Sequence, residues 1–249
     1  MRNPNRIKLR HIAPNVVTVF AICAGLTSVR MSLEGHLETG LYFVLLAVFL
    51  DAADGKLARF LDSASLFGAE LDTLADFFNF GIAPGVLLYN TLYIGTEHAN
   101  IGWLATLVLA VCCALRLARF NLSTKSSGAP QKKAAFFVGV PAPALACLAL
   151  MPIFIHLHGW QTEEIPLLCA AYTIGVGFLA VSTVPTFSIK HASIKRSQLP
   201  LAIIISIVLV TCLMVYPWPT LIAANLTYLA SMPFSYRSEQ KHSKSLADV

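Results

Sequence analysis

Long apolar segments separated by short polar breaks make up most of the chain between residues 15 and 233. A helix needs about 20 apolar residues to cross the hydrocarbon core of a bilayer. The pattern therefore predicts an all-α, polytopic transmembrane helix bundle of about eight spans. These spans are expected at residues 15–33, 39–58, 67–90, 101–120, 137–156, 165–186, 199–216 and 218–233. The last two are short and could instead form one hairpin pressed against the bundle.

The polar segments at the two ends divide the chain into three parts around a single domain. Residues 1–14 form a basic arm, residues 15–233 the transmembrane domain, and residues 234–249 a polar tail that we expect to be disordered. The arm could lie on anionic lipid headgroups or be an ordinary positively charged flank of the first span. The residues support both interpretations equally.

The distribution of charge predicts the orientation of the spans. If the N-terminus is cytoplasmic, eight spans return the C-terminus to the cytoplasm. Every Lys and Arg except Arg30 then lies on the cytoplasmic side, as the positive-inside rule requires. The loops on the other side carry acids instead, which are Glu34, Glu38, Glu97, Glu163 and Glu164. Both termini are therefore predicted to be cytoplasmic.

Composition narrows the function classes. With 56% hydrophobic and 12% charged residues, the chain differs in amino-acid composition from ordinary soluble globular proteins. Its net charge of +5 follows from the topology, and no separate basic domain points to a nucleic-acid partner. The six cysteines lie in apolar segments without the paired spacing of a zinc site or disulfide framework. We therefore expect an integral membrane protein whose partners include membrane lipids.

Four aspartates interrupt the apolar pattern where the second span ends and the third begins. Asp51 and Asp54 are three residues apart, and Asp72 and Asp76 are four apart, so each pair shares one helix face. The link between the spans is short enough to make them antiparallel neighbours, so the four carboxylates should converge. Ionisable residues inside a membrane are costly and usually functional. An oxygen-only cluster suits Mg²⁺ or Mn²⁺, ions that also bind phosphate oxygens.

Small residues lie beside these acids. Gly55 and Ala58 share the face of Asp51, and Gly68 lies on the facing helix. They could open room for a phosphate-bearing group, or they could be ordinary small-residue contacts between membrane helices. For the glycines alone, the packing interpretation is favoured.

The acids, small residues and one arginine have the spacing D-x2-D-G-x2-A-R-x8-G-x3-D-x3-D, which is formed by Asp51, Asp54, Gly55, Ala58, Arg59, Gly68, Asp72 and Asp76. This stretch resembles the signature of the CDP-alcohol phosphotransferases. The resemblance implies a core of six transmembrane helices, a homodimer, and transfer of a substituted phosphate from a CDP-alcohol to an acceptor hydroxyl, with release of CMP. It covers 26 residues with eight specified positions.

The same resemblance implies roles for the residues of the signature. Asp51, Asp54 and Asp72 would bind one or two metal ions, and two ions would suit the diphosphate of the donor. Asp76 would complete the cluster or act as general base, and a residue that binds a metal strongly is a poor base. Gly55 and Ala58 would border the cytidine and ribose. Gly68 would face them, and Arg59 would contact the donor phosphate.

Three further segments resemble the bacterial, membrane-integrated phosphatidylserine synthases, namely "ELDTLADFFNFGIAP" (residues 70–84), "LRLARFN" (115–121) and "FVGVPAPA" (137–144). This resemblance implies CDP-diacylglycerol as the donor and L-serine as the acceptor. It further implies a bacterial inner membrane location, with the active site facing the cytoplasm.

A serine acceptor needs a cation for its carboxylate, and Arg116 and Arg119 offer planar donors at the cytoplasmic end of the fourth span. Both could instead be positively charged anchors at the interface, an alternative that is weaker for Arg116. Asn121, Lys125, Lys132 and Lys133 are further candidates for acceptor or phosphate contacts.

Two alternatives to a serine acceptor stay open. The acceptor could be glycerol 3-phosphate, choline or inositol phosphate. The chain could also be a cation transporter that uses its intramembrane acids as an ion path. A transporter would more typically spread such acids along the bundle and show inverted repeats, and the sequence has neither feature.

Overall fold

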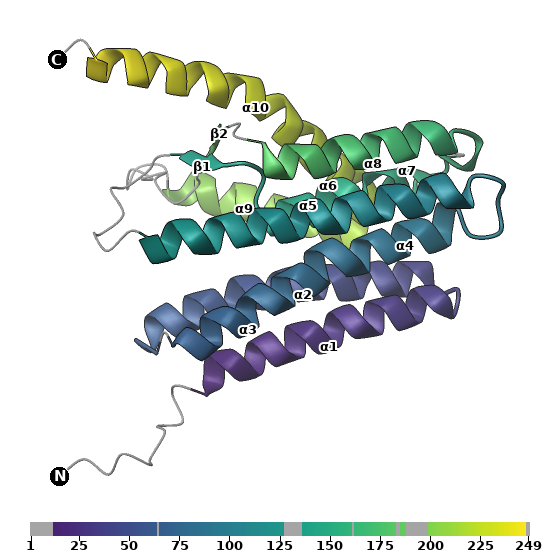
Figure 1. The fold of residues 1–249 in the computed structure, drawn as a ribbon, viewed down its shortest axis with the longest axis horizontal. Helices are drawn as coiled ribbons and strands as arrows, with labels where there is room; N and C mark the ends of the chain where they lie inside the picture. Colours follow the sequence, from purple (N-terminus) through teal and green to yellow (C-terminus); the bar gives the residue numbers. More distant parts are fainter. Residues whose placement is uncertain are drawn as a thin grey trace.

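The computed structural model describes residues 12–63, 65–126, 136–160, 162–182, 185–187 and 199–247. Figure 1 shows its helices lying side by side along the long axis of the molecule. In chain order the elements are α1 (Ala13–Leu33), α2 (Leu37–Phe60), α3 (Leu66–Asp76), the π-helix η2 (Phe77–Ile82), α4 (Ala83–Leu92), α5 (Ala99–Ser126), β1 (Phe136–Val138), α6 (Ala142–Ala149), α7 (Met151–Leu157), the 3-10 helix η3 (Thr162–Glu164), α8 (Pro166–Val181), β2 (Pro185–Phe187), α9 (Leu199–Val215) and α10 (Pro217–Ala247).

The predicted fold class, an all-α membrane helix bundle, is confirmed. Within the described residues, three helical stretches are long and apolar enough to cross a membrane, namely Ala13–Leu33, Leu66–Leu92 and Ala99–Leu122. α8 and the stretch Pro200–Val215 are shorter apolar helices. The number of spans and the side on which each terminus lies stay predictions.

The predicted helix over residues 137–156 is wrong in two places. Residues 136–138 form β1, and the helix begins only at Ala142, after Gly139 turns the chain with a φ of +79°. The helix is then interrupted at Leu150, because Pro152 has no N–H to donate to the carbonyl of Leu148. The hydroxyl of Tyr172 on α8 donates to that carbonyl instead, at 3.0 Å.

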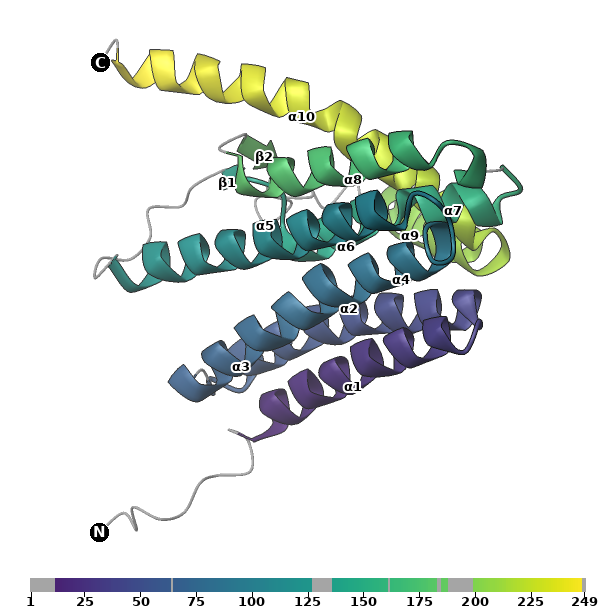
Figure 2. The same cartoon turned by 45° about the vertical axis from the view of Figure 1, so that its right-hand side comes forward.

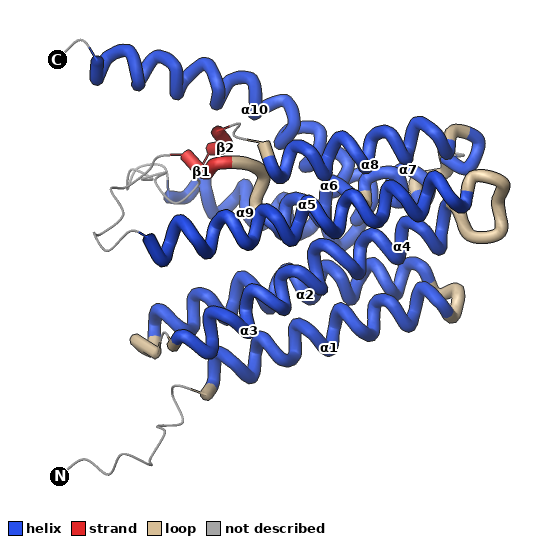
Figure 3. Tube along the Cα trace, in the orientation of Figure 1, coloured by secondary structure: helices blue, strands red, loops and turns tan. Residues whose placement is uncertain are grey.

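The segment after α8 also departs from the prediction of a helix over residues 165–186. α8 ends at Val181, and β2 pairs with β1 as a short antiparallel ladder in which Phe136 lies opposite Phe187. Figure 3 shows both strands at one end of the helix bundle. The ladder ties the segment before α6 to the segment after α8.

The C-terminal tail is helical through Ala247, so the expectation of disorder from residue 234 is wrong for that part. Figures 1 and 2 show the second half of α10 leaving the bundle. Pro233 lies inside this helix and removes a main-chain hydrogen bond, which is the usual cause of a bend. Residues 1–11 of the basic arm lie outside the described residues.

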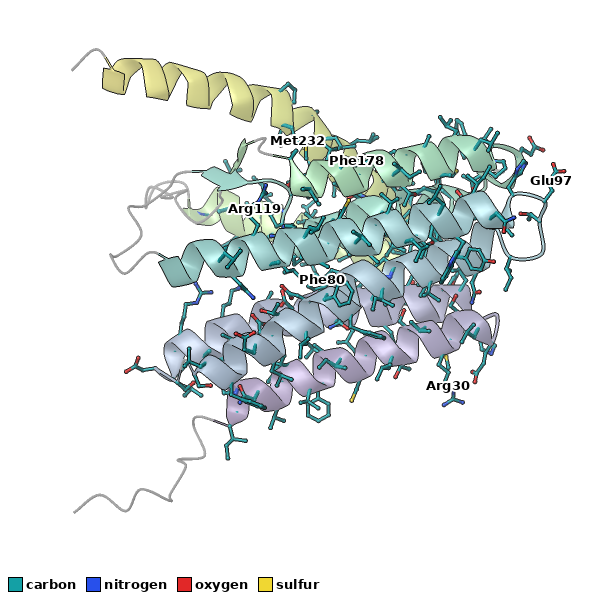
Figure 4. The ribbon with its side chains drawn as sticks, viewed as in Figure 1. Arg30, Phe80, Glu97, Arg119, Phe178 and Met232 are labelled. Carbon is teal, nitrogen blue, oxygen red and sulfur yellow. The ribbon has the colours of Figure 1, made fainter. Side chains whose placement is uncertain are left out.

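Two buried apolar clusters hold the bundle together. The first joins α2, α4, α7 and α8, and includes Trp218 of α10, whose ring stacks on Phe154 with centroids 6.0 Å apart. The second surrounds Phe80 of η2 and includes Leu117 of α5 and Met232 of α10. Figure 4 shows Phe80 in the interior, between the ribbon of its own helix and that of α5. The second cluster therefore supports the helices that carry the aspartates.

The last two helices differ in their packing. α9 exposes apolar side chains at consecutive positions from Ile203 to Ile205 and from Ile207 to Val210, so all its faces are uncovered. α10 packs into the bundle, and its Asn225 donates a hydrogen bond to the carbonyl of Cys147 at 2.8 Å. The first half of α10 is thus part of the packed bundle.

Candidate functional site

Three of the four predicted aspartates form one group. Asp51 comes from α2, and Asp72 and Asp76 come from α3. One carboxylate oxygen from each lies within 4.8 Å of the others, and the carboxyl groups of Asp51 and Asp76 interact directly. The prediction that the acids of the two helices converge is confirmed for these three.

The link between α2 and α3 brings the two acid-bearing faces together. Asp62 turns the chain with a φ of +47°, a conformation that aspartate tolerates better than most residues. Ser65 then caps α3, because its side chain accepts a hydrogen bond from the N–H of Gly68 at 3.0 Å. α3 therefore starts at Leu66, six residues before Asp72.

Asp54 lies beside the group of three but is held by another helix. It is 4% exposed, and its Oδ2 accepts a hydrogen bond from the hydroxyl of Thr18 on α1 at 2.6 Å. Thr18 was not predicted. Its only signal in the sequence is a polar side chain in the first turns of the first span.

The helix changes its winding directly after Asp76. Residues 77–82 form a π-helix, a rare element that is frequently found at functional sites. Within it Asn79 is 1% exposed, and its Oδ1 has no hydrogen-bond partner. A Cβ on Gly25 of α1 would collide with the Asn79 side chain, so α1 and η2 approach closely only because residue 25 is glycine.

The described residues supply the aspartates with little compensating positive charge. In the part of the chain that the structure describes, no Lys or Arg forms an ion pair with any of the four. Arg116 of α5 lies near enough to Asp76 to interact with it electrostatically. The Oδ1 of Asp76 and the Nε of Arg116 are both buried, and neither has a hydrogen-bond partner among the described residues. Three grouped carboxylates with an unpartnered buried oxygen fit a hard divalent cation, and this group could hold a metal.

A pocket of about 160 Å³ opens next to the acids, between α1, α2 and α3. Its lining includes all three small residues that the sequence indicated and two of the aspartates. The lining residues are Pro14, Thr18, Asp54, Gly55, Ala58, Ser63, Ser65, Gly68, Ala69 and Asp72. Ser63 and Ser65 were missed, because the sequence places them in an ordinary polar link.

The two glycines that line the pocket differ in the space that a larger side chain would have. A Cβ on Gly55 would meet no atom within 4 Å, so packing does not require glycine at this position. A Cβ on Gly68 would lie 2.8 Å from the Oδ1 of Asn15 on α1, so the end of the Asn15 side chain would have to shift. Gly68 therefore closely faces a side chain of α1, whereas Gly55 borders open space in the pocket.

Arg59 lies at the exposed edge of this region. Its Nε donates to the carbonyl of Gly55 at 2.9 Å, one turn back on its own helix. It is not among the residues that line the pocket. Its contact with a donor phosphate stays a prediction.

The three predicted acceptor-site residues on α5 have different contacts in the structure. Arg119 donates to the carbonyls of Val181 at 2.7 Å and Ser182 at 3.2 Å, so it holds the C-terminal end of α8. Asn121 donates to the hydroxyl of Thr73 at 3.1 Å and ties α5 to α3. Of the three, Arg116 is the one that interacts with an acid of the group. The side chains of Lys125, Lys132 and Lys133 lie outside the description.

Arg30, the one basic residue that does not fit the predicted cytoplasmic distribution of Lys and Arg, lies at the opposite end of the bundle. Figure 4 shows Arg30 and Glu97 at one end of the bundle and Arg119 toward the other. The Nε of Arg30 lies 2.8 Å from a carboxylate oxygen of Glu34, one turn along. Its charge is therefore locally compensated.

Comparison with known proteins agrees with this geometry. Residues 11–184 match the family model described as CDP-alcohol phosphatidyltransferase. The chain belongs to this family. The matched segment contains the whole aspartate motif, Arg116 and Arg119, whereas α9 and α10 lie beyond it.

Several curated relatives carry a more specific name. A CDP-diacylglycerol--serine O-phosphatidyltransferase of Mycobacterium leprae is 35% identical over 92% of this chain and 76% of its own length. The protein of that name from Bacillus subtilis is 32% identical over 72% of this chain and 93% of its own length. An archaetidylserine synthase of Methanothermobacter thermautotrophicus is 30% identical over 74% of this chain and 73% of its own length. The predicted resemblance to phosphatidylserine synthases is confirmed.

Proposed function

We propose that this chain transfers the phosphatidyl group of CDP-diacylglycerol to the hydroxyl of L-serine, giving phosphatidylserine and CMP. The relatives that match over most of the chain are named for this reaction. The observation that carries the proposal is the group formed by Asp51, Asp72 and Asp76 beside the pocket at Gly55. Such a group suits a substrate that brings a diphosphate and a metal together.

The aspartates hold Mg²⁺ or Mn²⁺ in this proposal, with two ions as the preferred number. Asp51, Asp54 and Asp72 are the direct ligands, with Asp54 oriented by Thr18, and Asp76 lies in the same group as Asp51 and Asp72. When bound, the metal neutralises the diphosphate and stabilises the charge that develops on the departing CMP. The protein's part is to hold four carboxylates in place although they repel one another.

Asp76 is the proposed general base. Its unpartnered Oδ1 accepts the proton of the serine hydroxyl as the serine oxygen attacks the phosphatidyl phosphorus. The bond from that phosphorus to the bridging oxygen breaks, and CMP leaves with the electron pair. Burial of Asp76 keeps bulk water from competing with serine.

The donor occupies the pocket between the first three helices. Gly55 and Ala58 border the cytidine and ribose, and Gly68 faces them from α3. Arg59, at the exposed edge, contacts a donor phosphate. The acyl chains stay in the lipid, while the headgroup enters the pocket from the membrane surface.

The acceptor lies on the α5 side of the acids. Arg116 binds the serine carboxylate, because it is the α5 arginine that lies near Asp76 and has an unpartnered donor. Arg119 and Asn121 have protein contacts of their own, so we place them as supports of this site that could also reach the acceptor.

We further propose a bacterial inner membrane location, an active site that faces the cytoplasm, and a homodimer. The basic residues along one face of the predicted topology support the orientation. Because CDP-activated lipids and serine are polar at their reacting ends, a site at the membrane surface can receive both.

The test of the function measures CMP. Membranes that contain the protein are incubated with CDP-diacylglycerol, Mg²⁺ or Mn²⁺, and one acceptor at a time. We expect CMP with L-serine and little with glycerol 3-phosphate, choline or inositol phosphate. CMP with another acceptor alone would replace serine within the same reaction. No CMP with any acceptor would favour the cation transporter.

The role of Arg116 gives a second prediction. Arg116→Ala should raise the KM for serine about 100-fold and leave the KM for CDP-diacylglycerol unchanged, because a charge-assisted contact to the acceptor alone is lost. Steady-state CMP release at varied serine measures the effect. Arg30→Ala, at the opposite end of the bundle, is the matched control. An unchanged KM for serine would show that Arg116 does not bind the carboxylate.

A further inference from the structure

Arg116 has a neighbour outside the aspartate motif, which is Tyr228 of α10. The Arg116 guanidinium lies near enough to interact electrostatically with both Asp76 of α3 and Tyr228 of α10. Tyr228 packs against the second apolar cluster, which also contains Leu117, the residue after Arg116. Groups from α3, α5 and α10 thus converge at the acceptor side of the acids.

The position of Tyr228 is fixed by contacts on both sides of it along α10. Asn225 is held by the carbonyl of Cys147, and Met232 is 7% exposed within the second apolar cluster. The helix backbone that carries Tyr228 is therefore held in place before a ligand binds, which lowers the cost of ordering this region.

Two polar atoms in this region have unused hydrogen-bonding capacity. The Nε of Arg116 and the Oδ1 of Asp76 are both buried without a partner. Buried polar groups in folded proteins are nearly always hydrogen-bonded, so unpaired ones of opposite charge in one place indicate a ligand that meets both. An amino acid whose carboxylate faces Arg116 and whose hydroxyl faces Asp76 has this chemistry.

We propose that Tyr228 and Arg116 together bind the carboxylate of the amino-acid acceptor, so that α10 completes the acceptor site. This inference rests on the proposed function and adds a residue to it. The guanidinium supplies the charge, and the phenol donates one hydrogen bond to a carboxylate oxygen. An acceptor without a carboxylate would leave the Arg116 guanidinium without its counter-charge, which would select against choline.

The proposal gives the C-terminal helices a function. The acids and the donor pocket lie within the family-matched segment that ends at residue 184, whereas Tyr228 lies beyond it. The donor chemistry would then reside in the segment shared by the family, and part of the acceptor recognition in a helix outside it.

The experiment compares Tyr228→Phe with the wild type in steady-state CMP release, with serine and CDP-diacylglycerol each varied in turn. Phenylalanine keeps the ring packing and removes only the hydroxyl. The KM for serine should rise about tenfold, with kcat and the KM for CDP-diacylglycerol unchanged, as for the loss of one hydrogen bond to a charged group. Tyr172→Phe is the matched control, because its ring packs on the same cluster while its hydroxyl bonds to the carbonyl of Leu148.

The outcomes separate this inference from the proposed function. CMP release by the wild type with serine supports the function whatever Tyr228 does. An unchanged KM for serine in Tyr228→Phe would overturn the inference alone. A rise in both KM values, or an equal rise in Tyr172→Phe, would also overturn it, since it would show a general effect on packing. A wild type that uses only an acceptor lacking a carboxylate would overturn both.

Discussion

Asp76→Asn is expected to lower kcat by about 1,000-fold or more and to leave the affinity for CDP-diacylglycerol unchanged. Asparagine keeps the size of the side chain and one oxygen, but it cannot accept the proton of the acceptor hydroxyl. Asp76 has one buried oxygen without a partner, which is the atom available for that proton. Transfer is measured as CMP release, and donor affinity by equilibrium binding of labelled CDP-diacylglycerol to the purified protein in detergent.

A matched control is Asp62→Asn. Asp62 lies in the exposed link between α2 and α3 and belongs neither to the group of three acids nor to the pocket lining. Its substitution should change neither transfer nor donor binding. If Asp76→Asn loses donor affinity as strongly as transfer, Asp76 acts mainly as a metal ligand, and the role of general base passes to another group.

The convergence of the acids could be predicted because it depends on local geometry. The spacing of Asp51, Asp72 and Asp76 places them on definite helix faces, and a short link forces two helices into antiparallel contact. Neither step needs knowledge of distant parts of the chain. The same argument extends to Gly55, which lies on the face of Asp51 and borders the pocket.

The residues that the sequence did not indicate come from helices far away in the chain. Thr18 reaches Asp54 across 36 positions, and Tyr228 reaches Arg116 from α10. A single threonine or tyrosine in an apolar span looks like an ordinary core residue. Only the packing of α1 and α10 against the others shows that these hydroxyls lie beside charged groups.

Errors in the predicted helices have local causes that periodicity does not detect. The run from Phe137 to Ile155 has no charged or polar side chain, so it is long enough for a span. Gly139 and Pro141 delay the helix, and Pro152 breaks it at Leu150. The compensation at that break is again distant, because the Leu148 carbonyl is satisfied by Tyr172 of α8.

Asp51→Asn is expected to have the other large effect, loss of both transfer and metal-dependent donor binding. Asp51 is the member of the group that α2 contributes, and it interacts directly with Asp76 of α3. Loss of its charge leaves the group of three with two carboxylates, both from α3. Changes to residues that merely support metal ligands weaken metal binding about 10- to 100-fold, and loss of a ligand should exceed that.

The measurement for Asp51→Asn is labelled CDP-diacylglycerol binding at increasing Mg²⁺ or Mn²⁺, with and without a chelator. Wild-type binding should rise with the metal and fall when the chelator is added, whereas binding to the variant should stay low throughout. Asp62→Asn again serves as the control and should behave as the wild type. Equal donor affinity and turnover in the wild type and Asp51→Asn would refute the ligand role. Because Asp51 is the one member of the group on α2, that result would also remove the reason for the two acid-bearing faces to meet.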